Sequence, residues 1–321
     1  MLNFLFLCIM LLIESKTTNP YFNIATEEYL LKNREENILF LYKNAPSVII
    51  GKHQIHHLEV NIPHIVEKNI PVIRRISGGG SVYHDEQNLN YSIITSENKA
   101  WVNFDEFTKP FIHFLKSLDL HPELRSKSDV RLAGKKISGN ASHIFKSRVM
   151  HHGSILFATA LDELTSCLKN RPTCYKKKVV NSRRSIVTNI KTHLNSAISF
   201  SDFTQKFIEY LYEFGSINSS EELSDEATCA IQNLALEKYS SVEWNVGYNA
   251  NYTFTNSFLH NGKIVNITLE IKKGVCETAK TNHTLCKDIE RVIQNVPHET
   301  FSFTKALSPY FSSREILSFF F

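Results

Sequence analysis

Three consecutive glycines, Gly78 to Gly80, follow two arginines within the segment from Arg74 to Asp85. Glycine has no Cβ atom, so the backbone there can adopt positive φ angles and a ligand can approach the main-chain N–H groups. Two cationic side chains directly upstream suit an anionic ligand. The segment lacks the lysine of a Walker A loop, and Tyr83 stands where the dinucleotide fingerprint has its third glycine. The pattern predicts a strand–turn–strand unit that binds a nucleotide in another way, although a plain glycine-rich hairpin has the same appearance.

A second segment, Lys127 to Ala141, combines charged residues with glycines. It is typical of a β-hairpin that turns at Ala133-Gly134. Lys136 follows the turn on the returning strand, and Asp129 lies on the strand that pairs with it. Most lysines are simply solvated at a surface. A lysine beside an aspartate nevertheless has the groups that a phosphate and its Mg²⁺ require, so both interpretations of Lys136 stand.

The histidines and cysteines do not favour a resident metal centre. His53, His56 and His57 have a spacing that suits metal ligation on a helix, but no carboxylate or fourth ligand accompanies them, and we interpret them as solvent-exposed loop histidines. His151 and His152 begin another strand, where only one of them can face inward. The six cysteines show neither Cys-x-x-Cys spacing nor a zinc pattern, which is typical of reduced thiols in a cytosolic protein.

The composition is ordinary for a globular protein, with 42% hydrophobic and 21% charged residues. The formal net charge of +4 suits anionic ligands or an acidic partner and is too weak to indicate nucleic-acid binding. The apolar stretch 1–13 lacks a basic n-region and a cleavage site, and it is too short to span a membrane. We interpret it as a mis-assigned start or a first strand, and we predict a cytoplasmic protein without a membrane segment.

Hydrophobic periodicity predicts alternating strands and helices up to about residue 247. Leu11 to Glu14 is typical of a buried strand, and Tyr21 to Leu31 of an amphipathic helix capped by Asn19. Ser216 to Ser220 is polar and predicts a hinge between two helices. Residues 252–271 have the pattern of a hairpin with its turn at Asn261-Gly262. Three further helical segments follow, near residues 285–296, 301–307 and 312–319.

In combination, these motifs resemble lipoate–protein ligase A, a family of the biotin/lipoate protein ligase superfamily. The resemblance runs nearly end to end, and it is carried by Pro20 to Asn23 with Glu27-Glu28, Pro46 to Gln54, Arg74 to Asn90, Gly134 to Ala141, His151 to Gly153, Arg184 to Ile190 and Glu243 to Gly247. It implies an α+β fold, in which residues 1–247 form a mixed-sheet catalytic domain and residues 252–321 form a small α/β accessory domain.

The family reaction has two half-steps in one site. Lipoate and ATP give lipoyl-AMP and pyrophosphate, and a lysine amine of a lipoyl domain then attacks the mixed anhydride. The resemblance implies that Lys136 is catalytic, against the reacting carboxylate and the α-phosphate, and that Asp129 binds Mg²⁺. The residues that it implies for binding ATP and substrate are Arg75, Ser77, Gly78, Gly79, Gly80, Ser81, Val82, Tyr83, Asn88, Ser138, Ala141 and His152. The implied acceptors are lipoyl domains of 2-oxoacid dehydrogenase E2 subunits or the glycine-cleavage H protein.

Other readings of the same site predict different sequence features. Octanoyltransferases of the superfamily have a cysteine shortly before the histidine-glycine pair, where this chain has Arg148 to Met150, which counts against a thioester mechanism. A biotin ligase predicts another arginine-glycine loop and often a DNA-binding domain, and the sequence has neither. A lipoyltransferase that uses preformed lipoyl-AMP needs the same pocket and stays the main alternative. A non-catalytic nucleotide sensor would not need Lys136, Asp129 and Arg75 together.

Two departures from the family pattern do not touch the expected chemistry. Ser128 precedes Asp129 where relatives often have asparagine, and Asn249 to Asn251 lacks a common proline. The segment from residue 171 to residue 184 is rich in basic side chains. They belong to Arg171, Lys176, Lys177, Lys178, Arg183 and Arg184. We expect this segment to dock an acidic lipoyl domain.

Overall fold

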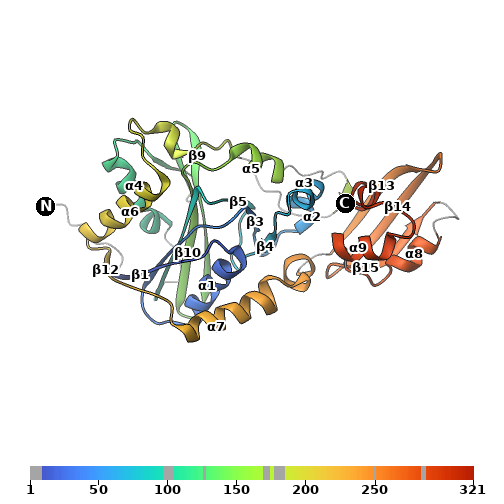
Figure 1. The fold of residues 1–321 in the computed structure, drawn as a ribbon, viewed down its shortest axis with the longest axis horizontal. Helices are drawn as coiled ribbons and strands as arrows, with labels where there is room; N and C mark the ends of the chain where they lie inside the picture. Colours follow the sequence, from blue (N-terminus) through green and yellow to red (C-terminus); the bar gives the residue numbers. More distant parts are fainter. Residues whose placement is uncertain are drawn as a thin grey trace.

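The computed structural model describes residues 9–96, 104–125, 128–168, 174–176, 185–248, 251–282 and 287–321. Within these residues the chain forms three β-sheets, of eight, four and three strands, with helices packed against them. Figure 1 shows the eight-stranded and four-stranded sheets in different halves of an elongated molecule. The predicted mixed α+β class is confirmed. The basic segment proposed for docking lies outside the described residues, except that the backbone of Lys176 is described.

The largest sheet has the strand order β12-β1-β2-β6-β10-β9-β8-β7. Its strands are β1 (Met10–Glu14), β2 (Ile38–Tyr42), β6 (Asn88–Ser96), β7 (Glu123–Arg125), β8 (Asp129–Leu132), β9 (Lys135–Phe145), β10 (Arg148–Leu156) and β12 (Ile217–Glu221). β1 runs parallel to both of its neighbours, and the other pairs are antiparallel. The long ladder of β6, β10 and β9 aligns three chain segments that the sequence analysis singled out separately.

Two helices, α4 (Phe104–Ser117) and α6 (Phe200–Glu213), provide most of the aromatic residues of one core. Phe114 of α4 and Phe203 of α6 have ring centroids 5.3 Å apart, and both are fully buried against the sheet. Because these side chains recur at helical spacing, they form the apolar stripe that a packed helix needs. They belong to the core and do not line the cavity described below.

A second core joins α1 (Pro20–Asn33) and α7 (Asp225–Leu234) to the largest sheet and to the three-stranded sheet. In that smaller sheet β3 (Ser47–Ile50) lies between β4 (Val72–Arg74), which is parallel to it, and β5 (Val82–His84), which is antiparallel. Asn19 caps α1 as expected, since its Oδ1 accepts from the N–H groups of Tyr21 and Phe22. The small sheet and α1 therefore pack against the largest sheet.

The second half of the molecule contains β11 (Tyr175–Lys176), β13 (Tyr252–His260), β14 (Lys263–Lys272) and β15 (Val275–Thr281), with α8 (Lys287–Ile293), α9 (Thr300–Leu307) and α10 (Ser313–Phe320). Asn261 and Gly262 both have positive φ, 50° and 73°, as a two-residue hairpin turn requires. A separate hydrophobic cluster fills this half. β11 comes from the middle of the chain and pairs with β13, so the four-stranded sheet is not built from the C-terminal residues alone.

The predicted hinge at Ser216 to Ser220 is wrong. Most of it belongs to β12, which pairs in parallel with β1, with Met10 opposite Ile217. Only Ile217 of this edge strand is buried, and its other side chains are exposed. Such a strand has no hydrophobic pattern for a sequence analysis to detect.

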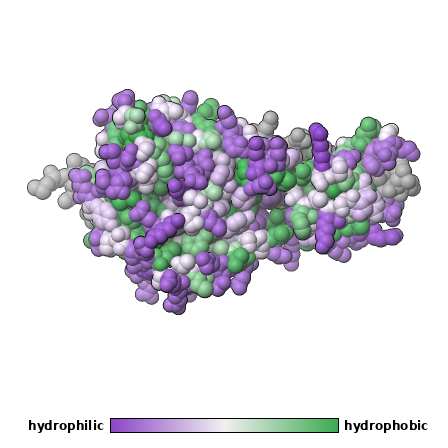
Figure 2. Space-filling view, in the orientation of Figure 1, coloured by the Kyte–Doolittle hydropathy of each residue, from purple (hydrophilic) through white to green (hydrophobic). Residues whose placement is uncertain are grey.

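Polar residues cover much of the face shown in Figure 2, with hydrophobic residues in small separate groups. The described part of the chain has no helix that is long and apolar enough to cross a membrane. The remaining short helical elements are α2 (His56–Glu59), α3 (Ile62–Glu67), α5 (Leu161–Cys167), η2 (Ile190–His193), η3 (Ala235–Tyr239) and η4 (Glu243–Gly247).

Buried histidines connect α2 to the C-terminal half. His57 stacks on His298, with ring centroids 4.7 Å apart, and His298 stacks on Phe321 at 4.9 Å. The Tyr252 hydroxyl lies 2.7 Å from Nδ1 of His298 and 3.2 Å from Nδ1 of His57. The interpretation as solvent-exposed loop histidines is therefore wrong for His56 and His57, which lie in α2, whereas His53 is exposed. A neutral imidazole packs as an aromatic ring, which residue polarity alone does not reveal.

We expect acid to weaken this contact. Burial lowers the pKa of His298 to about 4 and that of His57 well below its ordinary value, so both rings are neutral in the folded chain. The unfolded chain takes up protons below about pH 6.5, and the free energy of unfolding should fall as the pH decreases from there toward 4. Thermal unfolding across this range measures the slope. His57→Phe keeps a stacking ring and should flatten the slope, whereas an unchanged slope would contradict the prediction.

Candidate active site

The glycine-rich turn joins β4 to β5 and lies against the chain segment that follows β3. Gly79 has a φ of 92°, which favours glycine. A Cβ atom on Gly51 would lie only 2.1 Å from the carbonyl oxygen of Gly79. The Lys52 N–H donates to the carbonyl of Ser77 at 2.8 Å. Two glycine-containing segments, 25 or more residues apart in the sequence, thus approach each other backbone to backbone.

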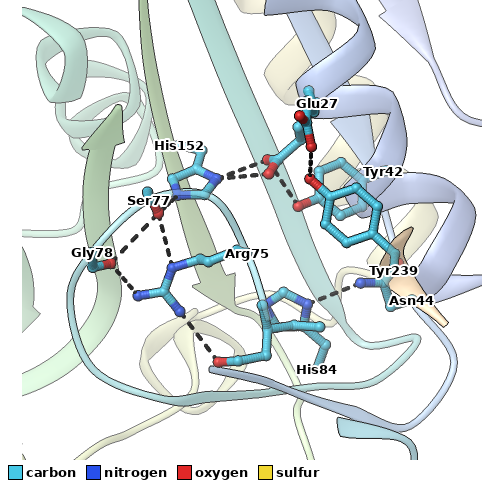
Figure 3. A network of polar contacts seen from close by, with 11 residues as sticks. Glu27, Tyr42, Asn44, Arg75, Ser77, Gly78, His84, His152 and Tyr239 are labelled. Carbon is cyan, nitrogen blue, oxygen red and sulfur yellow. Dashed lines mark hydrogen bonds and ion pairs between the residues drawn. The ribbon is translucent and has the colours of Figure 1, made fainter. Parts of the chain in front are cut away.

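The Arg75 guanidinium lies inside the curve of this turn (Figure 3). Its Nη2 donates to the carbonyls of Gly78 at 2.6 Å and Gly80 at 2.8 Å, and its Nε donates to Oγ of Ser77 at 2.9 Å. Its Nη1 donates to the carbonyl of Ile49 at 3.2 Å. Burial lowers the pKa of Arg75 to about 10, so the group is still a cation at neutral pH. Arg75 therefore fixes the shape of the turn and places a positive charge beneath it.

Arg74 points the other way and is fully buried. Its Nη1 donates to three carbonyls between Gly51 and Gln54, at 2.5 to 3.2 Å. Its Nε and Nη2 donate to the carbonyls of Trp244 at 2.8 Å and Asn245 at 2.7 Å. The Trp-Asn-x-Gly motif of η4 thereby reaches back to the glycine-rich turn and to the segment after β3.

Replacing Arg74 by methionine should lower the free energy of unfolding by about 2 kcal/mol. The variant leaves buried carbonyls without donors, and the lower cost of burying methionine offsets part of that loss. Denaturant unfolding measures the change. Arg125→Met is a matched control, because the Arg125 side chain is 63% exposed. Equal stability of the two variants would mean that Arg74 does not anchor these segments.

The second motif forms the predicted hairpin of β8 and β9. Ala133 and Gly134 both have positive φ, 47° and 74°, which fits a two-residue turn. Nζ of Lys136 lies 2.8 Å from Oδ1 of Asp129. A Cβ atom on Gly139 would lie 2.8 Å from the same Nζ, so this glycine makes room for the ammonium group. The backbone of Lys136 also forms a parallel bridge with Val187, which belongs to a third sequence motif.

His152 connects the glycine-rich turn to α1. Its Nε2 lies 2.6 Å from Oγ of Ser77, and its Nδ1 lies 2.9 Å from both carboxylate oxygens of Glu27. The Tyr42 hydroxyl donates to Glu27 at 3.0 Å. Figure 3 shows this chain of contacts running from the Arg75 guanidinium through Ser77 and the imidazole to α1. A ring protonated at Nδ1 satisfies both neighbours, with the serine hydroxyl donating to Nε2.

These elements surround a cavity of about 1040 Å³. The predicted site residues that line it are Arg75, Gly79, Gly80, Ser81, Val82, Tyr83, Asp129, Lys136, Ser138, Ala141 and His152. Ser77, Gly78 and Asn88 are not among the lining residues. Ser77 and Gly78 contact Arg75, whereas the Asn88 side chain donates to the carbonyl of Ile155 within the sheet, at 3.1 Å. The glycine-rich turn and the Lys136 hairpin thus lie on the walls of one cavity.

The family of the chain follows from comparison with known proteins. Residues 19–212 match the model of the lipoyl protein ligase A/B catalytic domain. The chain is 37% identical over 302 residues to lipoate–protein ligase 1 of Staphylococcus aureus, and the match covers 91% of this chain and 92% of that protein. This chain belongs to the lipoyl protein ligase A/B family.

Solved structures agree with this family. A lipoate–protein ligase A bound with ATP has a TM-score of 0.65 and 26% identity, and the match covers 75% of this chain and all of that one. A bipartite lipoate–protein ligase of Thermoplasma acidophilum, described together with its E2 lipoyl domain, has a TM-score of 0.66 and 27% identity. That match covers 75% of this chain and 97% of the other.

Some polar residues of the site escaped the sequence analysis. Glu27 appeared there only as part of a family motif, yet it is buried and contacts His152 across 125 residues of sequence. The Tyr91 hydroxyl donates to the side chain of Asn140, which lines the cavity. Both pairings depend on which strands are neighbours, so no local pattern reveals them. The signal available for Glu27 was a carboxylate with apolar residues one turn away on either side, Ile24 and Leu31.

Proposed function

We propose that this chain is an ATP-dependent lipoate–protein ligase. It activates lipoate with ATP to give lipoyl-AMP and pyrophosphate, and it then transfers the lipoyl group to a lysine of a lipoyl domain. One observation carries the proposal: the Lys136 ammonium and the glycine-rich turn face the same large cavity. The named activity of the Staphylococcus aureus relative and the ATP in the related ligase structure support it.

Activation brings two anions together, because the lipoate carboxylate has to approach the α-phosphorus among its negative oxygens. A cation held at that point offsets the repulsion and stabilises the charge that develops in the transition state. Lys136 supplies this cation, and Gly139 leaves space for it. The main chain of Gly78 to Tyr83 cradles the adenosine and phosphate, with its shape fixed by Arg75. Ser138, Ala141 and His152 complete the substrate pocket, and Ser77 holds the His152 ring from behind it.

Asp129 has the chemistry to bind Mg²⁺. Magnesium in nucleotide sites takes one or two carboxylates and completes its coordination with phosphate oxygens and water, so a single carboxylate beside a triphosphate fits it. Asp129 is mostly buried at the cavity wall and directly next to Lys136. The ion, when bound, neutralises phosphate charge. Asp129 itself holds the Lys136 ammonium in the cavity before the nucleotide arrives.

The transfer step needs no covalent nucleophile of the enzyme. The acceptor amine attacks the acyl carbonyl, the bond from that carbon to the phosphate oxygen breaks, and AMP leaves with the electron pair. Lys136 faces that phosphate in both half-steps, so it assists both. The acceptor is a lipoyl domain of an E2 subunit or the glycine-cleavage H protein, and the basic segment 171–184 docks it.

Two domains carry this work, residues 1–247 for activation and transfer and residues 252–321 as an accessory domain. The hydrophobic cluster of the C-terminal half supports this division, since Ile55 and Tyr175 are its only buried members from outside residues 252–321. The related ligase structures, which match 75% of this chain along nearly their whole length, support it as well. His57 and His298 form a buried contact between the two domains. A movement of the accessory domain between the two half-steps requires this contact to open.

A direct assay tests the activity. The purified chain, lipoate, Mg²⁺ and ATP should release pyrophosphate, and an apo lipoyl domain added to them should gain the mass of one lipoyl group. The alternative, a lipoyltransferase, predicts no pyrophosphate but intact transfer from preformed lipoyl-AMP. Absence of both reactions would overturn the proposal and leave a nucleotide-binding module.

A further inference from the structure

A further cation, Arg131, lines the cavity beside Lys136 and has no role in the mechanism so far. It lies on β8 two residues after Asp129, so both side chains are on the same face of the strand. The buried residues Val130 and Leu132 occupy the opposite face. Across the hairpin, the register pairs Arg131 with Lys136. The fold thus places two positive charges next to each other at one wall of the cavity.

The contacts of Arg131 leave part of its guanidinium for a ligand. Nη2 is 3.5 Å from Oδ2 of Asp129, whereas Nζ of Lys136 approaches Oδ1 of the same carboxylate to 2.8 Å. Nη1 donates to the carbonyl of Gly134 at 3.0 Å. Nε is buried and has no hydrogen-bond partner within the described part of the chain. One carboxylate shared by two cations leaves a net positive charge at this point, which suits an anion.

The activation step produces such an anion. A carboxylate oxygen forms a bond to the α-phosphorus, the bond from that phosphorus to the bridging oxygen breaks, and the bridging oxygen keeps the electron pair. Negative charge therefore develops on the departing pyrophosphate, and a cation near it lowers the barrier. Lys136 is assigned to the α-phosphate and the carboxylate, which leaves the departing pyrophosphate without a side-chain cation among the residues assigned so far.

The position of Arg131 fits a leaving group that has to reach water. β8 is the second strand from an edge of the largest sheet, and the Arg131 side chain is 23% exposed. On the other side of Lys136, the sheet leads through Gly139 and Ser154 toward the buried contacts of His152 and Glu27. Burying a pyrophosphate ion near those contacts would cost a large desolvation energy, so the ion is expected at the more exposed side, where Arg131 lies.

We propose that Arg131 binds the pyrophosphate portion of ATP and the pyrophosphate product. This inference rests on the proposed function, since it assigns a leaving-group site within that reaction. It separates the two cations by role: Lys136 serves both half-steps, whereas Arg131 serves activation alone. Lipoyl-AMP has no β-phosphate or γ-phosphate for Arg131 to contact.

The test compares the two half-reactions in Arg131→Gln. Activation should lose about tenfold in kcat/KM for ATP, and the inhibition constant of inorganic pyrophosphate should rise about tenfold, as expected for a lost charge-assisted hydrogen bond at a partly exposed site. Transfer from preformed lipoyl-AMP should keep its wild-type rate. Arg131→Lys preserves the charge and should recover most of the activation.

Arg125→Gln is the matched control, because this arginine is on the adjacent strand β7, is mostly exposed and does not line the cavity. Wild-type pyrophosphate inhibition in Arg131→Gln would overturn the inference, and so would an equal loss in both half-reactions, which a structural role predicts. If Arg131→Gln unfolds, calorimetry of inorganic pyrophosphate with wild type and Arg131→Lys decides, since an absence of binding to wild type overturns the inference. Failure of the proposed function is distinct, because the wild-type chain would then release no pyrophosphate.

Discussion

Replacing Lys136 by methionine should lower the rate of lipoyl-AMP formation by on the order of 10²-fold or more. Methionine is similar in length and apolar, so the variant removes the ammonium group with little change in volume. The reaction then has no cation at the point where carboxylate and α-phosphate meet. The loss should appear in kcat more than in KM, because the attraction strengthens as charge develops on the way to the transition state. Single-turnover release of pyrophosphate measures it.

The matched control is Lys135→Met, which removes the same charge from the preceding residue. Lys135 is exposed and does not line the cavity, so activation should stay close to wild type. Transfer from preformed lipoyl-AMP should also fall in Lys136→Met, since the same ammonium faces the phosphate of the leaving AMP. Activation at the wild-type rate in Lys136→Met would remove the central element of the proposed mechanism.

Much of the fold could be predicted from the sequence because several of its elements are locally encoded. The turn at Ala133-Gly134 needs two positive φ angles, and the sequence has residues that tolerate them. Asn19 before Pro20 encodes the start of α1 in the same way. The glycine-rich turn belongs to this group as well. Its three glycines predict a backbone that another group can approach closely, but they do not identify that group.

The structure adds partners that are distant in sequence. The Arg75 guanidinium holds the carbonyls of its own turn, so a charge that the sequence suggests for a ligand also has a structural task. Glu27 contacts His152 only because α1 packs over β10. Such contacts depend on sheet order, and sheet order results from long-range packing that no local pattern determines. The resemblance to the family identified Glu27 and His152 as motif residues, but it did not predict that they contact each other.

Residues that stabilise the fold and residues that shape the candidate active site are adjacent at Arg74 and Arg75. Arg74 ends β4 and Arg75 is the next residue, and the two guanidinium groups contact different parts of the chain. One group anchors the segment after β3 and the Trp-Asn-x-Gly motif, and the other shapes the glycine-rich turn. Variants of this pair should therefore combine loss of stability with loss of activity, whereas variants of Lys136 should affect activity alone.

Replacing Gly51 by alanine should inactivate the chain through the backbone alone. The added Cβ atom would lie 2.1 Å from the carbonyl oxygen of Gly79 and 3.1 Å from its carbon, and neither atom belongs to a side chain that can rotate away. The glycine-rich turn has to move, which displaces the N–H groups that cradle the phosphate. A displacement of about 1 Å is enough to lower kcat/KM for ATP by on the order of 10²-fold. Crowding in this packed region should also cost about 1–3 kcal/mol of stability.

Gly78→Ala provides the matched control for stability, because a Cβ atom there meets nothing within 4 Å and Gly78 has no positive φ. Its free energy of unfolding should stay near the wild-type value while that of Gly51→Ala falls. Kinetics at a temperature where Gly51→Ala is folded then separate misplacement of the turn from unfolding. The added methyl group forces the main chain of the glycine-rich turn to move. Wild-type kinetics in the folded Gly51→Ala protein would therefore mean that this turn does not hold the nucleotide.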